Sequence, residues 1–473
     1  MSVVTLDTSQ AIPGSRRTSK HSVSRALGDT GMEVKNVEQM TGASELGTFS
    51  HTFLSPELKH LRKEYYTIIT RVTGLTVLIM WACLPVYWGA LATSTDMTRN
   101  LDAWFIDRDG SRIGNALWDV FGNFSAPGAH LGWTNVDPVN IGTNDDVAQA
   151  IVAEKAWIAV VVQANATSNL DMARANGDIT YDPTSAITVY YVQGRNEIAA
   201  ANAIVPITTN LLQQTTSAFA TYAAQRYLAQ IRPGGTINTT AYSLLANAPQ
   251  TLTPAVSWTM VNLRPYTAPV ATAVTLVGQI FITIFAFMTA MANATARSLV
   301  QQHLRLSSYL KLRIVIPLVI YFPLSLSYAL VNLAFNLPFG ARYNYASGFC
   351  LFWVYVYLAM ASLGLALESM ITLLTPRFVP FFLFTLIVFN VSPAVLPNEL
   401  QNPFYSYGYG FPVWNLSQAV RTIIFNTHSH LGVNASVLVG WIILSCGTIS
   451  AFTWFFRRQE KAAVCNQLDV SKS

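Results

Sequence analysis

The chain has 473 residues, of which 52% are hydrophobic and only 11% are charged, and its formal net charge is +5. This balance is typical of an integral membrane protein and excludes a chain built only of soluble domains. We therefore expect membrane lipids as partners and no nucleic acid.

Residues 1–54 are rich in Ser, Thr and Gly and contain few large apolar side chains. Such a segment buries too little apolar surface to fold, so the sequence predicts a disordered tail. The tripeptide Ser55-Pro56-Glu57 then supplies an N-cap residue, a proline at the first helical position and an acid in the first turn. It predicts a short basic helix over residues 55–71, next to the membrane.

Six stretches without Asp, Glu, Lys or Arg are long enough to cross a bilayer, because a spanning helix needs about 20 mostly apolar residues. They cover residues 72–95, 267–296, 314–341, 343–367, 378–398 and about 434–456. The predicted organisation is a first span over 72–93, an inserted domain over 94–266, a five-helix membrane domain over 267–458 and a tail over 459–473.

Most basic residues beside the spans fall on one face if both termini are cytoplasmic, as the positive-inside rule requires, and the opposite face has only Arg342 and Arg421 in its short loops. The majority precede the first span, follow the last, and lie in the second-to-third and fourth-to-fifth connections. Residues 94–266 are then extracytoplasmic, and three sequons in this region are candidates for N-glycosylation, at Asn123, Asn165 and Asn238. Sequons also occur outside it, at Asn293, Asn390, Asn415 and Asn434, so they support the topology only weakly.

The inserted domain shows both helical and strand patterns. Capping residues at Asn144 predict a helix to Lys155, the apolar run 157–162 predicts a strand, and a helix is expected around 170–175. A second strand over 186–192 and a long helix over 202–231 follow. This order predicts a small α/β unit with a mixed sheet, inserted into a polytopic α-helical membrane protein with six transmembrane helices.

Sequence motifs for catalysis, cofactors and metals are not found. The chain has no Gly-Lys dipeptide, which excludes a P-loop ATPase, and no His-Glu-x-x-His, Cys-x-x-Cys or Gly-x-Ser-x-Gly motif. We therefore predict no catalytic, cofactor-binding or metal site, and we do not expect an enzyme.

An ionisable residue in a membrane is costly and often functional, which makes Glu368 a candidate for binding a cationic group or carrying a proton. Because Glu368 follows the apolar run of the fourth span near its cytoplasmic end, the favoured alternative is an interfacial carboxylate that is hydrated or paired with Arg377.

The outer loop over 398–433 is crowded with aromatic residues. Tyr405, Tyr407, Tyr409 and Trp414 are candidates for contact with lipid headgroups or an amphiphilic substrate, or they anchor the loop at the interface. Residues 414–425 are expected to re-enter the membrane surface as a short amphipathic helix.

Several segments together resemble the fungal nitrosoguanidine-resistance membrane protein family, over about residues 70–458. They are Leu131-Gly132-Trp133, Glu154-Lys155-Ala156-Trp157, Asn165-Ala166-Thr167, Tyr181-Asp182-Pro183-Thr184-Ser185-Ala186, Arg195-Asn196-Glu197 and the run from Tyr405 to Pro412. One span, an exported domain and five further spans are also similar to ABC-2-type membrane proteins. The resemblance implies a plasma-membrane or endomembrane protein linked to drug and mutagen resistance and to phospholipid asymmetry.

The ABC-2 likeness further implies an exporter membrane domain worked by a separate ATPase subunit, with a homo-oligomer as another possible assembly. The coupling surface is then the basic connection that contains Arg297, Arg305, Lys311 and Arg313.

Two functions are open from the sequence. The first is a transporter-like protein that exports, or regulates the transbilayer movement of, lipids or drugs, most plausibly at the plasma membrane and alternatively at the vacuole or another endomembrane. The second is a non-transporting regulator or receptor whose extracytoplasmic domain binds a partner. A transport path predicts a polar cavity near the loop aromatics, and a scaffold predicts a dry, closed bundle.

Overall fold

The computed structural model describes residues 51–122, 128–232 and 238–470, with side chains described up to residue 460 except at residue 375. Most of the predicted N-terminal tail, the sequon residue Asn123 and the end of the C-terminal tail lie outside these residues. The chain divides into two compact units, residues 1–75 and residues 76–473.

The first unit contains the start of the first long helix. Ser55 precedes the short helix η1 (Pro56–Leu58), and α2 (Lys59–Ala92) follows directly. Arg62 Nη1 donates to the carbonyl oxygen of Phe53 at 2.9 Å, which fastens the approaching chain to the helix. Because α2 is uninterrupted, the predicted basic helix over 55–71 and the first span are one helix.

Among the described residues, six helices are long and apolar enough to cross a membrane, which confirms the predicted number of spans. They cover Pro56–Ala92, Pro269–Ser298, Leu306–Ala334, Tyr345–Leu374, Pro376–Ala394 and Leu431–Glu460. The third helix begins earlier than predicted. Lys311 and Arg313 interrupt the charge-free stretch of the sequence, but both lie inside the helix.

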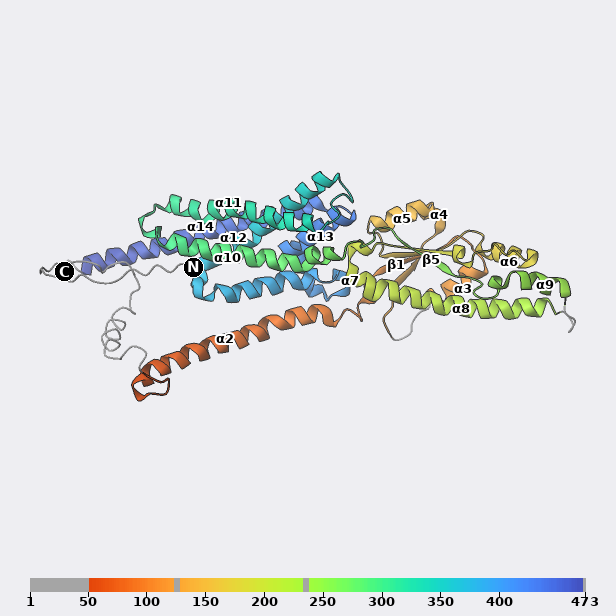
Figure 1. Ribbon diagram of the computed structural model, residues 1–473, viewed down its shortest axis with the longest axis horizontal. Coiled ribbons are helices and arrows are strands. Elements are labelled where there is room, and N and C mark those ends of the chain that lie inside the picture. Colours follow the sequence, from red (N-terminus) through yellow and green to blue (C-terminus); the bar gives the residue numbers. More distant parts are fainter. Residues whose placement is uncertain (1–50, 123–127, 233–237, 471–473) are drawn as a thin grey trace, which may run out of the picture. The chain divides into compact units, whose positions relative to one another are not determined.

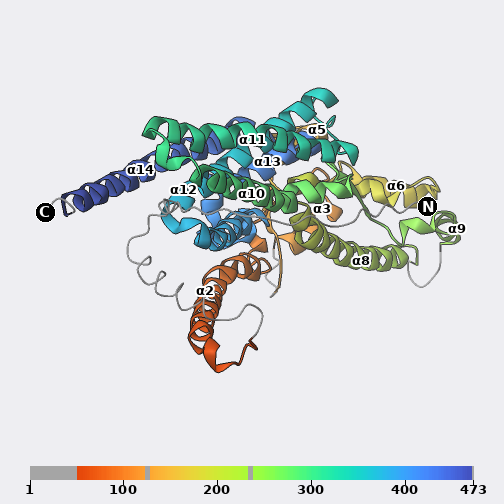
Figure 2. The same ribbon diagram turned by 60° about the vertical axis from the view of Figure 1, so that its left-hand side comes forward.

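The membrane part of the second unit is built from α10 (Gly278–Ser298), α11 (Leu306–Ala334), α12 (Tyr345–Val391) and α14 (Leu431–Val470). These helices lie side by side in Figures 1 and 2. Helix α12 supplies two spans, divided at Pro376, where proline removes a backbone donor and favours a kink. Short turns η8 (Pro269–Ala271) and η9 (Ala273–Val277) lead into α10.

The inserted domain holds a five-stranded mixed sheet with the order β2-β1-β3-β4-β5. The strands are β1 (Asp102–Asp107), β2 (Gly132–Asn135), β3 (Ile158–Val162), β4 (Ile187–Tyr191) and β5 (Trp258–Asn262). Neighbours run parallel except β3 and β4, which are antiparallel. The predicted mixed sheet and its two predicted strands are confirmed, whereas β1, β2 and β5 were not predicted.

Helices cover both faces of this sheet, as expected for strand β3, which is buried along its whole length. Val160 packs with Leu117 of α3 (Arg112–Phe121) and Leu212 of α8 (Val205–Gln230), on one face. Val161 packs on the other face with Val147 of α5 (Asn144–Val152). The remaining helices are α4 (Pro138–Ile141), α6 (Ala166–Asn176), α7 (Glu197–Ala199) and α9 (Thr239–Asn247), and the main short turns are η2 (Thr98–Asn100), η3 (Pro183–Ala186), η4 (Gln193–Arg195), η5 (Ala200–Ile204) and η7 (Pro249–Thr251).

The region predicted as an aromatic outer loop over 398–433 is largely helical. After η11 (Ser392–Ala394) it contains η12 (Asn398–Leu400), η13 (Pro403–Gly410) and α13 (Pro412–Phe425). The expectation of an amphipathic surface helix over 414–425 is wrong, since nearly all of α13 is buried. Its residues Leu416 and Ile423 pack against Phe352 of α12, which removes the face that would have met the bilayer surface.

Candidate functional site

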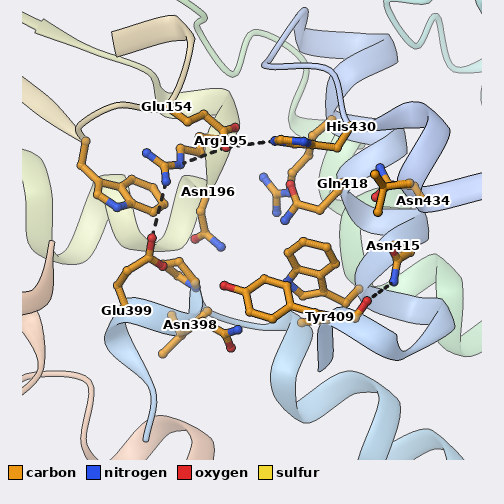
Figure 3. A pocket seen from close by; sticks show the side chains of 17 residues that line it. Glu154, Arg195, Asn196, Asn398, Glu399, Tyr409, Asn415, Gln418, His430 and Asn434 are labelled. Atoms are coloured by element: carbon orange, nitrogen blue, oxygen red, sulfur yellow. Dashed lines mark hydrogen bonds and ion pairs between the residues drawn. The ribbon is translucent and has the colours of Figure 1, made fainter. Parts of the chain in front are cut away.

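A cavity of about 280 Å³ lies where the inserted domain meets the membrane helices (Figure 3). Residues of the turn before β3 and of the end of η4 form one wall, and η12, η13, α13 and the start of α14 form the others. The side chains that the following paragraphs use are Glu154, Trp157, Arg195, Asn398, Glu399, Tyr409, Trp414, Asn415, Gln418, Arg421, His430 and Asn434.

The wall from the inserted domain centres on Arg195, at the end of η4. Its guanidinium carbon lies 3.5 Å from the centre of the Trp157 ring, a distance typical of a cation–π contact. Arg195 Nε lies 3.9 Å from Glu154 Oε2, and Arg195 Nη2 lies 3.5 Å from Glu399 Oε1. Burial lowers the pKa of Arg195, and the two carboxylates oppose that effect. Arg195 therefore links the inserted domain to η12 with its charge already balanced.

The opposite wall carries two of the predicted aromatic residues. Tyr409 and Trp414 pack edge to face with their ring centres 4.7 Å apart, and both border the cavity. Tyr405 and Tyr407 do not, because their hydroxyls donate to backbone carbonyls of Val86 and Phe389, at 2.8 and 3.0 Å. The structure therefore separates the four residues into two that border the cavity and two that fasten η13 to the spans.

Three asparagines beside the cavity have buried amide atoms without a hydrogen-bond partner. Among the described residues, both side-chain polar atoms of Asn398 and of Asn434 lack a partner, as does Oδ1 of Asn415. Asn415 and Asn434 are fully buried, with exposed fractions of 0%. Buried polar groups in proteins are nearly always paired, and leaving one unpaired costs roughly 1–3 kcal/mol. Five such atoms around one cavity indicate a place that receives polar groups from outside the chain.

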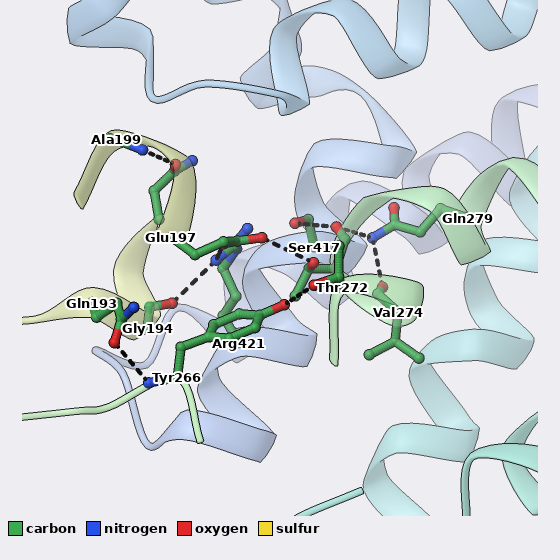
Figure 4. Close-up of polar contacts among 12 residues, drawn as sticks. Gln193, Gly194, Glu197, Ala199, Tyr266, Thr272, Val274, Gln279, Ser417 and Arg421 are labelled. Atoms are coloured by element: carbon green, nitrogen blue, oxygen red, sulfur yellow. Dashed lines mark hydrogen bonds and ion pairs between the residues drawn. The ribbon is translucent and has the colours of Figure 1, made fainter. Parts of the chain in front are cut away.

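A rigid polar junction lies behind the cavity (Figure 4). Arg421 of α13 forms a close ion pair with Glu197 of α7, and its Nη1 also donates to the carbonyl oxygen of Gly194 at 3.2 Å. Burial acts to raise the pKa of Glu197, but the charge and hydrogen bond of Arg421 outweigh burial and hold that pKa below its ordinary value. This pair fixes the inserted domain to the membrane part.

Two further contacts extend the junction into the turn that opens α10. Thr275 of η9 donates from Oγ1 to Glu197 Oε1 at 3.3 Å, and its carbonyl oxygen accepts from Ser417 Oγ at 2.6 Å. Gln279 Nε2 donates to the same carbonyl oxygen at 2.9 Å. These contacts connect η9 to α7, α13 and α10 at one point.

Glu368 lies elsewhere, inside the membrane helices, and does not border the cavity. It is fully buried, and its Oε1 accepts from Arg313 Nε at 2.8 Å and lies 2.7 Å from Arg297 Nη1. Arg313 Nη1 also donates to Thr453 Oγ1 of α14 at 2.7 Å. The expectation of a carboxylate that is either hydrated or paired with Arg377 is therefore wrong, since Glu368 is fully buried and is held by two arginines of other helices, while Arg377 is exposed.

Two of the four residues expected to form the coupling surface are not at the surface, because they pair with Glu368. Arg297 and Arg313 are buried, with exposed fractions of 5% and 1%, because they neutralise Glu368. Arg305 and Lys311 are exposed. Arg457 donates to the carbonyl oxygens of Gln301 and Leu304, at 2.6 and 2.7 Å, and fastens the second-to-third connection to α14.

The sequons differ sharply in exposure. Asn165 and Asn238 are exposed in the inserted domain and remain candidates for N-glycosylation. Asn390, Asn415 and Asn434 are buried, which leaves no space for a glycan.

Sequence reasoning missed most of the cavity residues, among them Glu154, Arg195, Asn398 and Asn434. Glu154 and Arg195 stand in two segments that carry the family resemblance, Glu154-Lys155-Ala156-Trp157 and Arg195-Asn196-Glu197, but no role was assigned to either. The pairing across the two parts of the chain could not be read from the sequence, because Arg195 and Glu399 are 204 positions apart.

Comparison with known proteins gives a family and a relative of low identity. A family model described as Protein of unknown function (DUF3533) matches residues 73–447. The chain is 23% identical over 425 residues to a Saccharomyces cerevisiae protein described as an uncharacterized endoplasmic reticulum membrane protein, covering 84% of this chain and 81% of that protein. No solved structure matches the chain.

Proposed function

The chain belongs to the DUF3533 family and is a multi-span membrane protein, and we propose that it moves, or regulates the movement of, amphiphilic molecules such as lipids or drugs across the bilayer. The observation that carries this proposal is the polar cavity beside Tyr409 and Trp414. In the proposal the polar headgroup of the amphiphile enters the cavity while its apolar part stays among the membrane helices.

The architecture of the cavity supports a binding step at one end of the spans. Its walls come from α13, from η12 and from the start of α14, which are continuous with or packed on the spanning helices. Aromatic residues such as Tyr409 and Trp414 favour the layer between hydrocarbon and water, where headgroups lie. A ligand that binds there has to be polar at one end and apolar at the other.

We also propose that the inserted domain is extracytoplasmic and that both termini are cytoplasmic, following the distribution of basic residues. The membrane is proposed to be the plasma membrane or an endomembrane. The description of the yeast relative favours the endoplasmic reticulum among the endomembranes.

A separate ATPase subunit or a second copy of this chain is the proposed partner for energised export. Two of the basic residues assigned to coupling remain available for it, since Arg305 and Lys311 are exposed at the second-to-third connection.

The alternative is a regulator or receptor that uses the same cavity without a path through the bundle. The observation that favours this alternative is the cluster around Glu368, which ties α10, α11, α12 and α14 together through buried contacts. Such a cluster opposes the separation of these helices that a transport path requires. A receptor does not require that separation.

The test is translocation of a fluorescent phospholipid and of an amphiphilic dye in proteoliposomes of the purified full chain, with and without ATP. The matched variants are Trp414→Ala, at the cavity, and Trp81→Ala, an exposed tryptophan of the first span. Intrinsic transport predicts translocation that is lost in Trp414→Ala and kept in Trp81→Ala. An absence of translocation under all conditions, including with co-purified partners, would contradict transport and favour the receptor alternative.

A further inference from the structure

We propose that the cavity recognises an uncharged, hydroxyl-bearing headgroup, as a glycosyl lipid presents it, rather than a phosphate or an ammonium group. This inference rests on the proposed function, because it takes the ligand to be an amphiphile held in the bilayer. It follows from the charges and from the unpaired hydrogen-bonding atoms that border the cavity.

The two arginines at the cavity are already paired with carboxylates of the protein. Arg195 lies between Glu154 and Glu399, as Figure 3 shows, and Arg421 is bound to Glu197. Neither arginine offers an uncompensated positive charge to a phosphate, and an anion would have to compete with a carboxylate for either one. The electrostatics therefore disfavour a phosphate at this position.

The unpaired atoms require both hydrogen-bond donors and acceptors from a ligand. Asn398 and Asn434 each leave an amide nitrogen and an amide oxygen free. A phosphate offers only acceptors, so it would leave the amide oxygens unpaired, whereas an ammonium group offers only donors and would leave the amide nitrogens unpaired. A hydroxyl both donates and accepts, so a group with several hydroxyls satisfies both kinds of atom.

This pattern does not depend on how the amide groups are oriented. Asn415 Nδ2 donates to the carbonyl oxygens of Tyr409 and Phe411 at 2.8 and 2.9 Å, which fixes its Oδ1 as the free atom. In Asn398 and Asn434 both atoms are free, so exchanging nitrogen and oxygen changes nothing. At least three free acceptors therefore remain, and these need donors that a phosphate lacks.

The size and position of the cavity restrict the ligand further. Its volume of about 280 Å³ is close to the lower limit of roughly 300 Å³ for small-molecule sites, which is room for a headgroup and not for acyl chains. The rings of Tyr409 and Trp414 give an apolar surface beside the amides, suited to the carbon face of a sugar ring. A lipid with a glycosyl headgroup meets all of these conditions.

The experiment measures lipid binding directly, without transport. Full-length protein in phosphatidylcholine nanodiscs is titrated with monoglucosyl diacylglycerol, with phosphatidylserine and with methyl β-glucoside, and bound ligand is counted by native mass spectrometry. The variant is Asn434→Leu, and its matched control is Asn293→Leu, because Asn293 in α10 also has an unpaired amide nitrogen but does not border the cavity.

We expect monoglucosyl diacylglycerol to bind more tightly than either phospholipid and the free glucoside, and Asn434→Leu to weaken its binding about tenfold, the effect of losing one or two hydrogen bonds. Asn293→Leu should bind as the wild type does. Since the Asn434 side chain has no hydrogen-bond partner in the part of the chain that the structure describes, Asn434→Leu should unfold at the same temperature as the wild type or higher, so weaker binding cannot come from misfolding.

Three results would overturn the inference: preferential binding of phosphatidylserine, binding of the glucoside without the lipid, or glycosyl-lipid binding that Asn434→Leu leaves unchanged. None of these decides the proposed function. Phospholipid translocation that depends on Trp414 but occurs without glycosyl-lipid binding would reject only the inference. Glycosyl-lipid binding without any translocation would reject only transport.

Discussion

Arg313 holds Glu368 at two points, since its Nε donates to Oε1 at 2.8 Å and its Nη2 donates to the backbone carbonyl oxygen of Glu368 at 2.6 Å. Both residues are buried in the membrane helices, with exposed fractions of 1% and 0%. Two donors of one guanidinium thus join α11 to α12, and Arg297 brings in α10. We interpret this cluster as stabilising the packing of the membrane helices, away from the cavity.

The first prediction concerns this cluster. Glu368→Gln removes the negative charge and leaves two buried guanidinium groups without compensation, so we expect a loss of roughly 3–5 kcal/mol of stability. Thermal unfolding of the purified protein in detergent measures the effect, and Arg305→Gln, at an exposed arginine of the same connection, is the control. A Glu368→Gln protein as stable as this control would show that the cluster does not stabilise the bundle.

The second prediction is a pH dependence at the junction between Glu197 and Arg421. Because the folded-state pKa of Glu197 is held below its ordinary value of 4.5, its ionised form contributes stability above that value, and this contribution is lost as the pH falls through the folded-state pKa. Glu197→Gln should therefore be destabilised most at pH 7, and its difference from the wild type should shrink steadily below pH 4.5. Unfolding temperatures measured from pH 7 to pH 3 test this, and a difference that stays constant over that range would contradict it.

The third prediction concerns topology. If the inserted domain is extracytoplasmic, its exposed sequons at Asn165 and Asn238 receive glycans, while the buried Asn415 and Asn434 do not. Expression in a eukaryotic host followed by endoglycosidase treatment should show a mobility shift, and Asn165→Gln and Asn238→Gln should each remove one step of it. Glycans that depend on Asn415 or Asn434 would contradict the structure, and no glycan at either exposed site would count against the topology.

Hydropathy predicted the six spans and the inserted α/β domain because long apolar runs and strand-helix alternation are local properties of the chain. Hydropathy failed where tertiary contacts change the free-energy cost of burying a residue. Charged residues normally end a span, yet Arg313 lies within α11 because Glu368 neutralises it from α12. Likewise, α13 looked amphipathic by sequence but is buried, because its polar residues Arg421 and Ser417 also have partners, in Glu197 and the carbonyl oxygen of Thr275.

The candidate site was predicted only in part. The aromatic residues of η13 drew attention to the right region, and Tyr409 and Trp414 do border the cavity. The polar half of the site was not predicted, because Glu154 and Arg195 belong to the inserted domain and only the fold brings them to Glu399. An asparagine such as Asn434 carries no recognisable motif, and its importance comes from having no partner once it is buried.

The most direct test of the central claim is labelling by a lipid that carries a photoactivatable group in its headgroup, followed by mass spectrometry of the modified peptides. Binding in the cavity predicts adducts on both of its walls, at Glu154 to Trp157 of the inserted domain and around Tyr409 or Gln418, with labelling reduced in Trp414→Ala. Adducts confined to the exposed faces of the spans, with none on the inserted domain, would contradict the claim that this cavity receives the headgroup of an amphiphile.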